Sequence, residues 1–354
     1  MSDIKVNKIK SLNGTNGPEI SGIVEMNSTG AMTLPRGNTA YRGGRGRGVF
    51  GGGYDGGSPW VTINTIDYVT IASLGNAHDF GDLSEKRSAK GGGSSATRGC
   101  FIAGRFPSAP SIQNVIDYIE IQSTGNAMDF GDLIHSGIPN QKGTSNQIRS
   151  VYGGGYINPG SNLHVNSIGY FTIATKGNSS DFGSFALFGR KQFSGSNGTR
   201  GIFAGNRGAN PGSPGVNTNN IEYVTLMSIG NAQDFGDLSE IRIQSNGSMT
   251  SSTRMVMQGG INPSAVNTID YLTMASTGDA IDFGDVSTTV REISSSTSSP
   301  TRGVFNTGSE GGGTTNNAIE YVTISTLGNS QDFGDLTSAR GVAGSVSDSH
   351  GGIV

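Results

Sequence analysis

A 20-residue segment, best preserved at residues 64–83, occurs six times in this chain at nearly constant spacing. Each copy contains Asp-Phe-Gly, extended to Asp-Phe-Gly-Asp-Leu in the best-preserved copies. The motif begins at Asp79, Asp129, Asp181, Asp234, Asp282 and Asp332, which gives intervals of 50, 52, 53, 48 and 50 residues. A fixed period of this length is typical of a repeat architecture, in which each unit buries its apolar surface against its neighbours.

Each repeat predicts four short β-strands. In the second repeat the strand-sized pieces are 87–96, 97–104, 115–122 and 127–133. The third piece is rich in β-branched and aromatic residues with a period of two. A Gly-Asn turn joins the third piece to the fourth, and glycine supplies the positive φ that such a turn needs. No segment has a helical period, so we expect an all-β protein.

Four antiparallel strands repeated around a ring are the blades of a β-propeller. An arginine of the second strand recurs six times, and His350 stands in the place of a seventh: Arg47, Arg98, Arg149, Arg200, Arg254 and Arg302. This count predicts seven four-stranded blades, the last formed by residues 19–36 and 337–354. Residues 1–18 would then be an attachment arm, and 19–354 a ring without a free sheet edge. The alternative is six blades and a separate N-terminal arm.

The layout of the repeat also carries a resemblance. Arg87 precedes a first strand, Gly52-Gly53 ends a second, Asp67-Tyr68 lies on a third and Phe80 on a fourth. In these features residues 36–354 resemble kelch repeats, although phenylalanine stands where kelch blades usually carry tryptophan. The twin glycine is also lost at 103–104 and 307–308. The form Gly-Asn-Ala-x-Asp-Phe-Gly-Asp-Leu is similar to repeat proteins encoded by tailed phages of marine cyanobacteria, and that resemblance implies a virion protein.

Composition narrows the classes of protein. With 24 basic and 27 acidic residues, nothing in the charge favours nucleic acid as a partner. No stretch reaches the ~18 apolar residues of a membrane span, and the N-terminus lacks the apolar segment of a signal peptide. We expect synthesis in the host cytoplasm, without secretion or membrane insertion. Cys100, the only cysteine, is expected to be a small buried thiol.

The motifs predict no catalytic residue, cofactor or metal. Asp-Phe-Gly is also the magnesium motif of protein kinases, but it occurs here six times without a His-Arg-Asp loop. The second aspartate of the motif, as in Asp82, lacks the spacing of a calcium loop. We expect it to accept backbone N–H groups or to pair with a repeated arginine. The four histidines stand at unlike positions in different repeats and do not predict a zinc site. The motif phenylalanines are expected to be buried between blades: Phe80, Phe130, Phe182, Phe235, Phe283 and Phe333.

Partner contact is expected where the repeats differ. The connections between second and third strands vary in sequence and should all emerge on one side of the ring, where loops on a rigid scaffold often bind partners. The candidate partner-binding residues are Trp60, Arg105, Phe106, Tyr156 and Arg207. The candidate virion-anchoring residues are Lys5, Lys8 and Lys10.

These patterns lead to a functional hypothesis. We expect a non-enzymatic virion structural protein, a tail-fibre or tail-associated propeller present in multiple copies per particle. Its partners would be other virion proteins and a host surface glycan or receptor. The alternatives are a capsid or neck decoration protein, a cellular kelch scaffold, and a propeller enzyme of the sialidase or galactose-oxidase kind acting on host polysaccharide. The enzyme would need an arginine cluster or a Tyr-Cys-His metal set at the axis, and only Cys100 could serve such a set.

Overall fold

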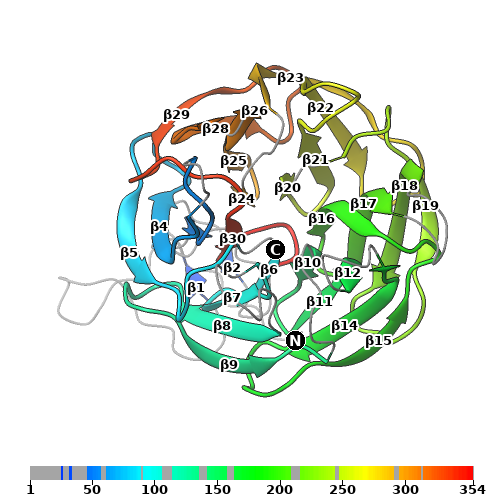
Figure 1. The fold of residues 1–354 in the computed structure, drawn as a ribbon, viewed down its shortest axis with the longest axis horizontal. Helices are drawn as coiled ribbons and strands as arrows, with labels where there is room; N and C mark the ends of the chain where they lie inside the picture. Colours follow the sequence, from blue (N-terminus) through cyan, green and yellow to red (C-terminus); the bar gives the residue numbers. More distant parts are fainter. Residues whose placement is uncertain are drawn as a thin grey trace, which may run out of the picture. The chain divides into compact units, whose positions relative to one another are not determined.

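The computed structural model describes residues 25–26, 32–33, 46–56, 61–88, 91–105, 114–134, 142–157, 163–208, 216–243, 247–290, 295–311 and 314–353. The chain divides into two units, Met1–Gly43 and Gly44–Val354. In the first unit, β1 (Glu25–Met26) pairs with β2 (Met32–Thr33) as a two-stranded sheet. In the second, the described residues form a β-propeller of six four-stranded antiparallel blades (Figure 1).

The strands of each blade are given in their order from the axis outward. Blade 1 contains β30 (Gly344–Ser347), β3 (Arg47–Gly51), β4 (Thr65–Thr70) and β5 (His78–Asp82). Blade 2 contains β6 (Gly91–Ser94), β7 (Arg98–Ile102), β8 (Val115–Glu120) and β9 (Met128–Asp132). Blade 3 contains β10 (Lys142–Ser145), β11 (Arg149–Gly153), β14 (Ser167–Thr172) and β15 (Ser180–Ser184).

The other three blades follow the same order. Blade 4 contains β16 (Arg190–Ser196), β17 (Arg200–Gly208), β18 (Val216–Thr225) and β19 (Gln233–Asp237). Blade 5 contains β20 (Ser248–Thr250), β21 (Arg254–Gln258), β22 (Val266–Thr273) and β23 (Ile281–Val290). Blade 6 contains β24 (Ser295–Ser298), β25 (Arg302–Asn306), β28 (Ala318–Thr323) and β29 (Gln331–Asp335). Two further hairpins, β12 (Tyr156–Ile157) with β13 (Leu163–His164) and β26 (Ser309–Gly311) with β27 (Thr314–Thr315), extend the connections of blades 3 and 6.

The prediction of seven blades is wrong, and the alternative of six is confirmed. The C-terminal strand β30 pairs with β3, so it is the missing first strand of the first repeat and not the start of a seventh unit. Beyond β30 the chain turns instead of forming a second strand, so His350 does not replace the repeated arginine. Residues 19–36 therefore have no seventh blade to close, while the proposed arm at 1–18 lies outside the described residues.

The core lies between blades, as the phenylalanine pattern predicts. All six motif phenylalanines are buried. Phe80 of blade 1, for example, belongs to one apolar cluster with Phe101 and Ile119 of blade 2. Each sheet therefore contributes apolar side chains to two neighbours, which explains why both faces of its strands are rich in apolar residues.

The repeated Gly-Asn turn and Asp-Phe-Gly-Asp motif form a clasp between neighbouring blades. The backbone N–H of Gly125 in blade 2 donates to the Phe80 carbonyl of blade 1 at 2.7 Å. The Asn126 side-chain oxygen accepts from the backbone N–H of Asp82 at 3.1 Å. Gly81 has φ of +145°, and a Cβ there would lie 2.5 Å from the Gly125 carbonyl oxygen. The clasp occupies the outer edge of each blade, which would otherwise present unpaired backbone groups.

Buried ion pairs form a second set of contacts, between a cation just before or within the first strand of a blade and a carboxylate of its third strand. Arg87 pairs with Asp117 at 3.0 Å and Arg242 with Asp270 at 2.7 Å, and all four side chains are fully buried. Arg340 pairs with Asp67, and Lys191 with Glu222. A hydroxyl at the end of the preceding blade also donates to three of these carboxylates: Ser84 to Asp117, Ser239 to Asp270 and Thr337 to Asp67. The buried cations thus pair with carboxylates of the third strand, whereas Asp82 takes part in the clasp through its backbone.

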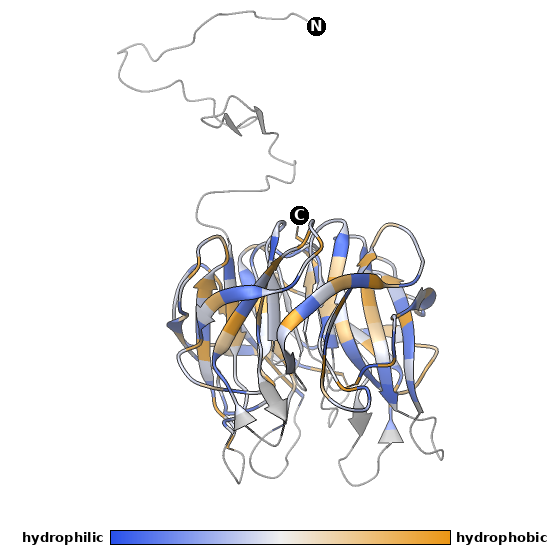
Figure 2. Cartoon of the chain, turned by 90° about the horizontal axis from the view of Figure 1, so that it is seen from above, coloured by the Kyte–Doolittle hydropathy of each residue, from blue (hydrophilic) through white to orange (hydrophobic). Residues whose placement is uncertain are grey.

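The ring has two different faces, because every blade has the same strand order (Figure 2). The start of β3 pairs with the end of β4 and lies beside the end of β30. We call this side, which carries the first-to-second and third-to-fourth turns, the turn face. The opposite side carries the second-to-third connections and is called the loop face. Within the part of the chain that the structure describes, no helix is long and apolar enough to cross a membrane.

Candidate functional site

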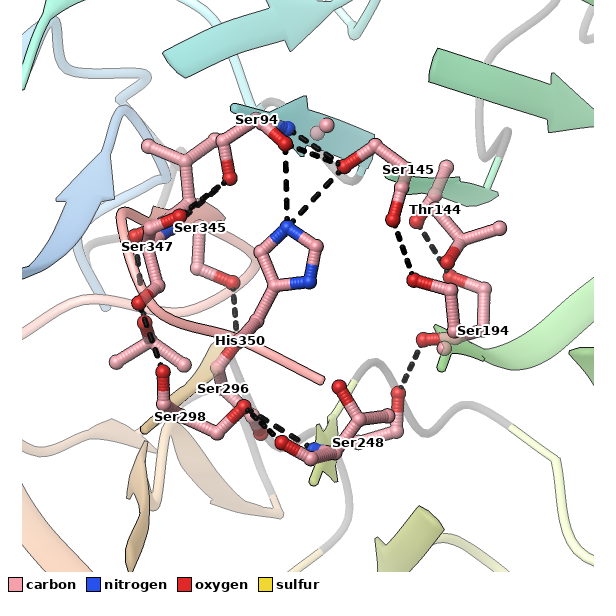
Figure 3. Close-up of a pocket in the computed structure, with 18 of the residues that line it drawn as sticks. Ser94, Thr144, Ser145, Ser194, Ser248, Ser296, Ser298, Ser345, Ser347 and His350 are labelled. Atoms are coloured by element: carbon pink, nitrogen blue, oxygen red, sulfur yellow. Dashed lines mark hydrogen bonds between the residues drawn. The ribbon is translucent and has the colours of Figure 1, made fainter. Parts of the chain in front are cut away.

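The six innermost strands surround a polar cavity of about 80 Å³ on the axis of the ring. Glycine, serine and threonine make up most of its lining (Figure 3). Six hydroxyl residues stand at equivalent places in the blades, and we call them the hydroxyl ring: Ser94, Ser145, Ser196, Thr250, Ser298 and Ser347.

The hydroxyl ring satisfies the open edges of the innermost strands. The Ser145 hydroxyl accepts from the Ser94 N–H at 2.7 Å and donates to the Ser94 carbonyl at 2.9 Å. Ser298 bridges the N–H and carbonyl of Thr250 in the same way, at 3.1 and 2.9 Å. Buried backbone groups without a partner destabilise a fold, so these bridges stabilise a region that has no room for a further strand.

One joint of the hydroxyl ring differs from the others. In the described structure, the Thr250 hydroxyl is the member that makes no bond to the preceding blade. Its oxygen accepts instead from the N–H of Gly351 at 3.1 Å, and the Thr250 carbonyl accepts from the same N–H at 3.1 Å. The C-terminal segment Asp348–Ile353 therefore enters the axis where the hydroxyl ring is interrupted, and the chain end lies near the centre of the ring (Figure 1).

His350 is fixed inside the cavity by both of its ring nitrogens. Its Nδ1 accepts from the Gly352 N–H at 3.0 Å, so in the neutral ring the proton is on Nε2. Nε2 lies 3.2 Å from the Ser94 carbonyl oxygen, to which it donates, and 3.2 Å from the Ser145 hydroxyl. Burial lowers the pKa of His350 to about 4, so the ring is neutral at pH 7.

The Ser145–His350 pair does not have the geometry of a catalytic dyad. A general base needs a free lone pair aimed at the nucleophile's proton. Here that nitrogen carries a proton, while the Ser145 hydroxyl donates to the Ser94 carbonyl. In this state neither atom can activate the other.

The two glycines of the C-terminal segment are required by close contacts. A Cβ at Gly351 would overlap the Ser251 carbonyl oxygen, and one at Gly352 would overlap the Ser145 carbonyl oxygen. The segment ends with the Ile353 carbonyl, which accepts from the Gln147 side-chain amide at 2.9 Å. The space that the segment fills beside the cavity thus fits a histidine followed by two glycines.

The predicted partner-binding residues lie on the loop face as far as they are described. Arg105 is exposed just beyond β7, where its backbone pairs with Ser88. Arg207 is half-buried near the end of β17, and Tyr156 lies in β12 with its backbone opposite His164. These three residues lie at or just beyond the ends of the second strands of three consecutive blades, so the structure distributes them around the face and does not gather them into one cluster.

The remaining candidates lie outside the described residues. These are Trp60 and Phe106 on the expected loop surface, and Lys5, Lys8 and Lys10 of the expected anchor. Cys100 is confirmed as a buried thiol, and burial raises its pKa. Among the residues that the structure describes, no group of three or more His, Cys, Asp or Glu side chains could hold a metal ion.

The hydroxyl ring and the C-terminal segment were not identified from the sequence. A signal for the hydroxyl ring is present, because a serine or threonine stands four residues before five of the six repeated arginines, as in Ser94 and Arg98. The fit of His350 had no such signal, since it depends on how the chain turns after β30. A scan against protein-family models and a search of curated proteins found no match to this chain.

Proposed function

We propose that this protein is a non-enzymatic structural protein of a tailed-phage particle, a tail-fibre or tail-associated propeller. Its loop face would meet a host surface glycan or receptor, or dock to another virion protein. The resemblance of the repeat to phage-encoded proteins supports the viral assignment. The difference between the turn face and the loop face supports the role in attachment.

The proposal rests on this difference between the two faces. The described part of the ring begins at Gly46 on the turn face, where its N–H donates to the Asp348 carboxylate at 2.8 Å. The variable connections emerge on the loop face. A particle that holds the ring by its turn face would therefore display the variable surface on the opposite side.

The construction of the ring also fits an attachment role. Clasps, ion pairs and hydroxyl bridges recur around the circumference, so the strands are held by the same contacts while the loops differ. Loops on a rigid scaffold can change without loss of the fold. Arg105 and Arg207 offer donors for sugar hydroxyls or carboxylates at such a surface.

The proposal is tested on purified particles in two steps. Antibody to this chain should label the tail in electron micrographs, whereas labelling of the head or neck would favour the decoration alternative. Absence of the chain from particles would contradict the viral assignment.

The second step changes Trp60, Phe106 and Tyr156 together to serine and measures host-cell adsorption. Exposed apolar residues of the outer wall, Met128 and Ile281, are changed to serine as a control. We expect reduced adsorption only for the loop-face variant, with normal incorporation. Normal adsorption and incorporation would contradict receptor binding, and failed incorporation would instead make the loop face a docking surface within the particle.

A further inference from the structure

The C-terminal segment contacts the axial cavity as a bound peptide would. Four features define the contact: the paired acceptors of Thr250 for the Gly351 N–H, the approach of His350 Nε2 to Ser94 and Ser145, the close approach of both glycines, and the Gln147 amide on the Ile353 carbonyl. None of these contacts belongs to the β30–β3 ladder that closes the ring. The segment could therefore leave the cavity without unpairing a strand.

We propose that the space between the innermost strands and the turns that follow them, beside the axial cavity, is a binding site for a short peptide containing a histidine followed by two glycines, and that the segment Asp348–Ile353 occupies this site. The site also has what is needed to accept such a peptide from a second molecule. Thr250 is the ring member whose hydroxyl serves the segment and not its neighbouring blade, so the hydroxyl ring contains a position adapted to a ligand.

The recognised form of the peptide has a neutral histidine. If the imidazole were protonated, Nδ1 would carry a proton directed at the Gly352 N–H, and the bond between them would be lost. The groups around the imidazole do not compensate for its added charge, because Ser94, Ser145 and Thr250 do not titrate in this pH range. The lining also contains Lys142, and the nearby carboxylate of Asp348 accepts from Gly46, Arg47 and Gln122.

The site further requires glycine at two positions. A methyl group on either glycine would overlap a backbone carbonyl of the innermost strands or of the turn that follows them, and these atoms are held by the ladders of the ring. A peptide with alanine at the second glycine should therefore not bind. This requirement distinguishes a specific site from general adhesion to a polar channel.

The experiment uses a chain that ends at Asp348, which keeps β30 and the Asp348 contacts. The probe is a labelled peptide, acetyl-Ser-His-Gly-Gly-Ile-Val, and its binding is followed by fluorescence anisotropy. We expect saturable binding to the shortened chain. The full chain should bind at least a hundred-fold more weakly, because its own segment competes at an effective concentration of about millimolar.

Two peptide variants test the recognition. The peptide with alanine at the second glycine should not bind detectably. The original peptide should bind about twenty-fold more weakly at pH 5 than at pH 7, given a free histidine pKa near 6.5 and a bound pKa of about 4. A peptide with glutamine in place of histidine should lose this pH dependence.

A second variant covers the possibility that shortening the chain disturbs the fold. Gly352→Ala in the full chain should displace the segment and allow the same peptide to bind. If both variants fold and neither binds the peptide, the proposal is wrong. If neither variant retains the cooperative unfolding of the full chain, the segment is an inseparable part of the core, and the proposal is equally wrong.

Discussion

At the scale of single residues, the buried ion pairs carry the largest expected effects. Asp270→Asn leaves the Arg242 guanidinium buried without its counter-charge, and breaking a buried pair in this way typically costs about 3–5 kcal/mol. The matched change is Glu120→Gln, because the Arg98–Glu120 pair is partly exposed to solvent. It should cost no more than ~1 kcal/mol. Urea unfolding of both variants measures the difference, and equal losses would contradict the assigned role of burial.

His350 gives the protein a pH-dependent stability. Its pKa is about 4 in the folded chain, below the ordinary value near 6.5, so its contribution is complete above pH 6.5 and is lost as the pH falls towards 4. The loss amounts to about 3 kcal/mol. Asp348, whose pKa is raised by burial, acts in the opposite sense.

The comparison of wild type with His350→Gln isolates the histidine, because Asp348 is present in both chains. Unfolding free energies measured from pH 7 to pH 4 should converge as the pH falls. A constant difference across this range would show that the imidazole is already protonated in the folded chain, or that it lies in water.

At the scale of elements, the clasp explains why glycine recurs in the motif. Gly81 and Gly125 both have strongly positive φ, so alanine strains the backbone at either position. Only at Gly81 would the added Cβ also meet a carbonyl of the next blade, since nothing lies within 4 Å of a Cβ at Gly125. Gly81→Ala should therefore lower the thermal midpoint clearly more than Gly125→Ala. Equal shifts would mean that the clasp yields to the added methyl group.

The strands were predictable from the sequence for a local reason. Alternating β-branched and aromatic residues, as in Val115–Glu120, predict a strand directly, and the glycine turns predict the hairpins between strands. The burial of the motif phenylalanines could also be predicted, because the same side chain recurs in every copy. The clasp, the ion pairs and the hydroxyl ring join residues of neighbouring blades or distant parts of one blade, and one repeat read alone contains no information about such distances.

At the scale of the whole molecule, the number of blades could not be counted from the repeats. The last first-strand copy looked like the start of a new unit, yet it completes blade 1. Counting units along the chain cannot show whether the end continues the series or returns to its beginning, because that depends on the angle between blades. The loop-face residues could be assigned to one side, since all blades share one topology, but their spacing around the ring could not.

Six-blade closure makes a prediction for the two ends of the chain. Removing residues 1–43 should change the free energy of unfolding of the ring by no more than ~0.5 kcal/mol, because β3 already has its partner in β30. Removing 344–354 should abolish cooperative unfolding or cause aggregation, since it exposes the β3 edge and opens the hydroxyl ring. Calorimetry of both truncated chains is the measurement. A large loss on removing 1–43 would contradict an independent ring.

The pairing of β30 with β3 also orders events in time during synthesis. The second strand of blade 1 leaves the ribosome early, whereas its inner partner is made only after the other five blades. At ~5–20 residues per second, the intervening chain takes roughly 15–60 s to synthesise. During that interval the nascent chain carries an open edge at blade 1 while the other five blades are made. Neighbouring chains on ribosomes of the same message can therefore pair through these edges. The ring can close only once β30 has been made, and this strand therefore determines when the molecule stops being adhesive.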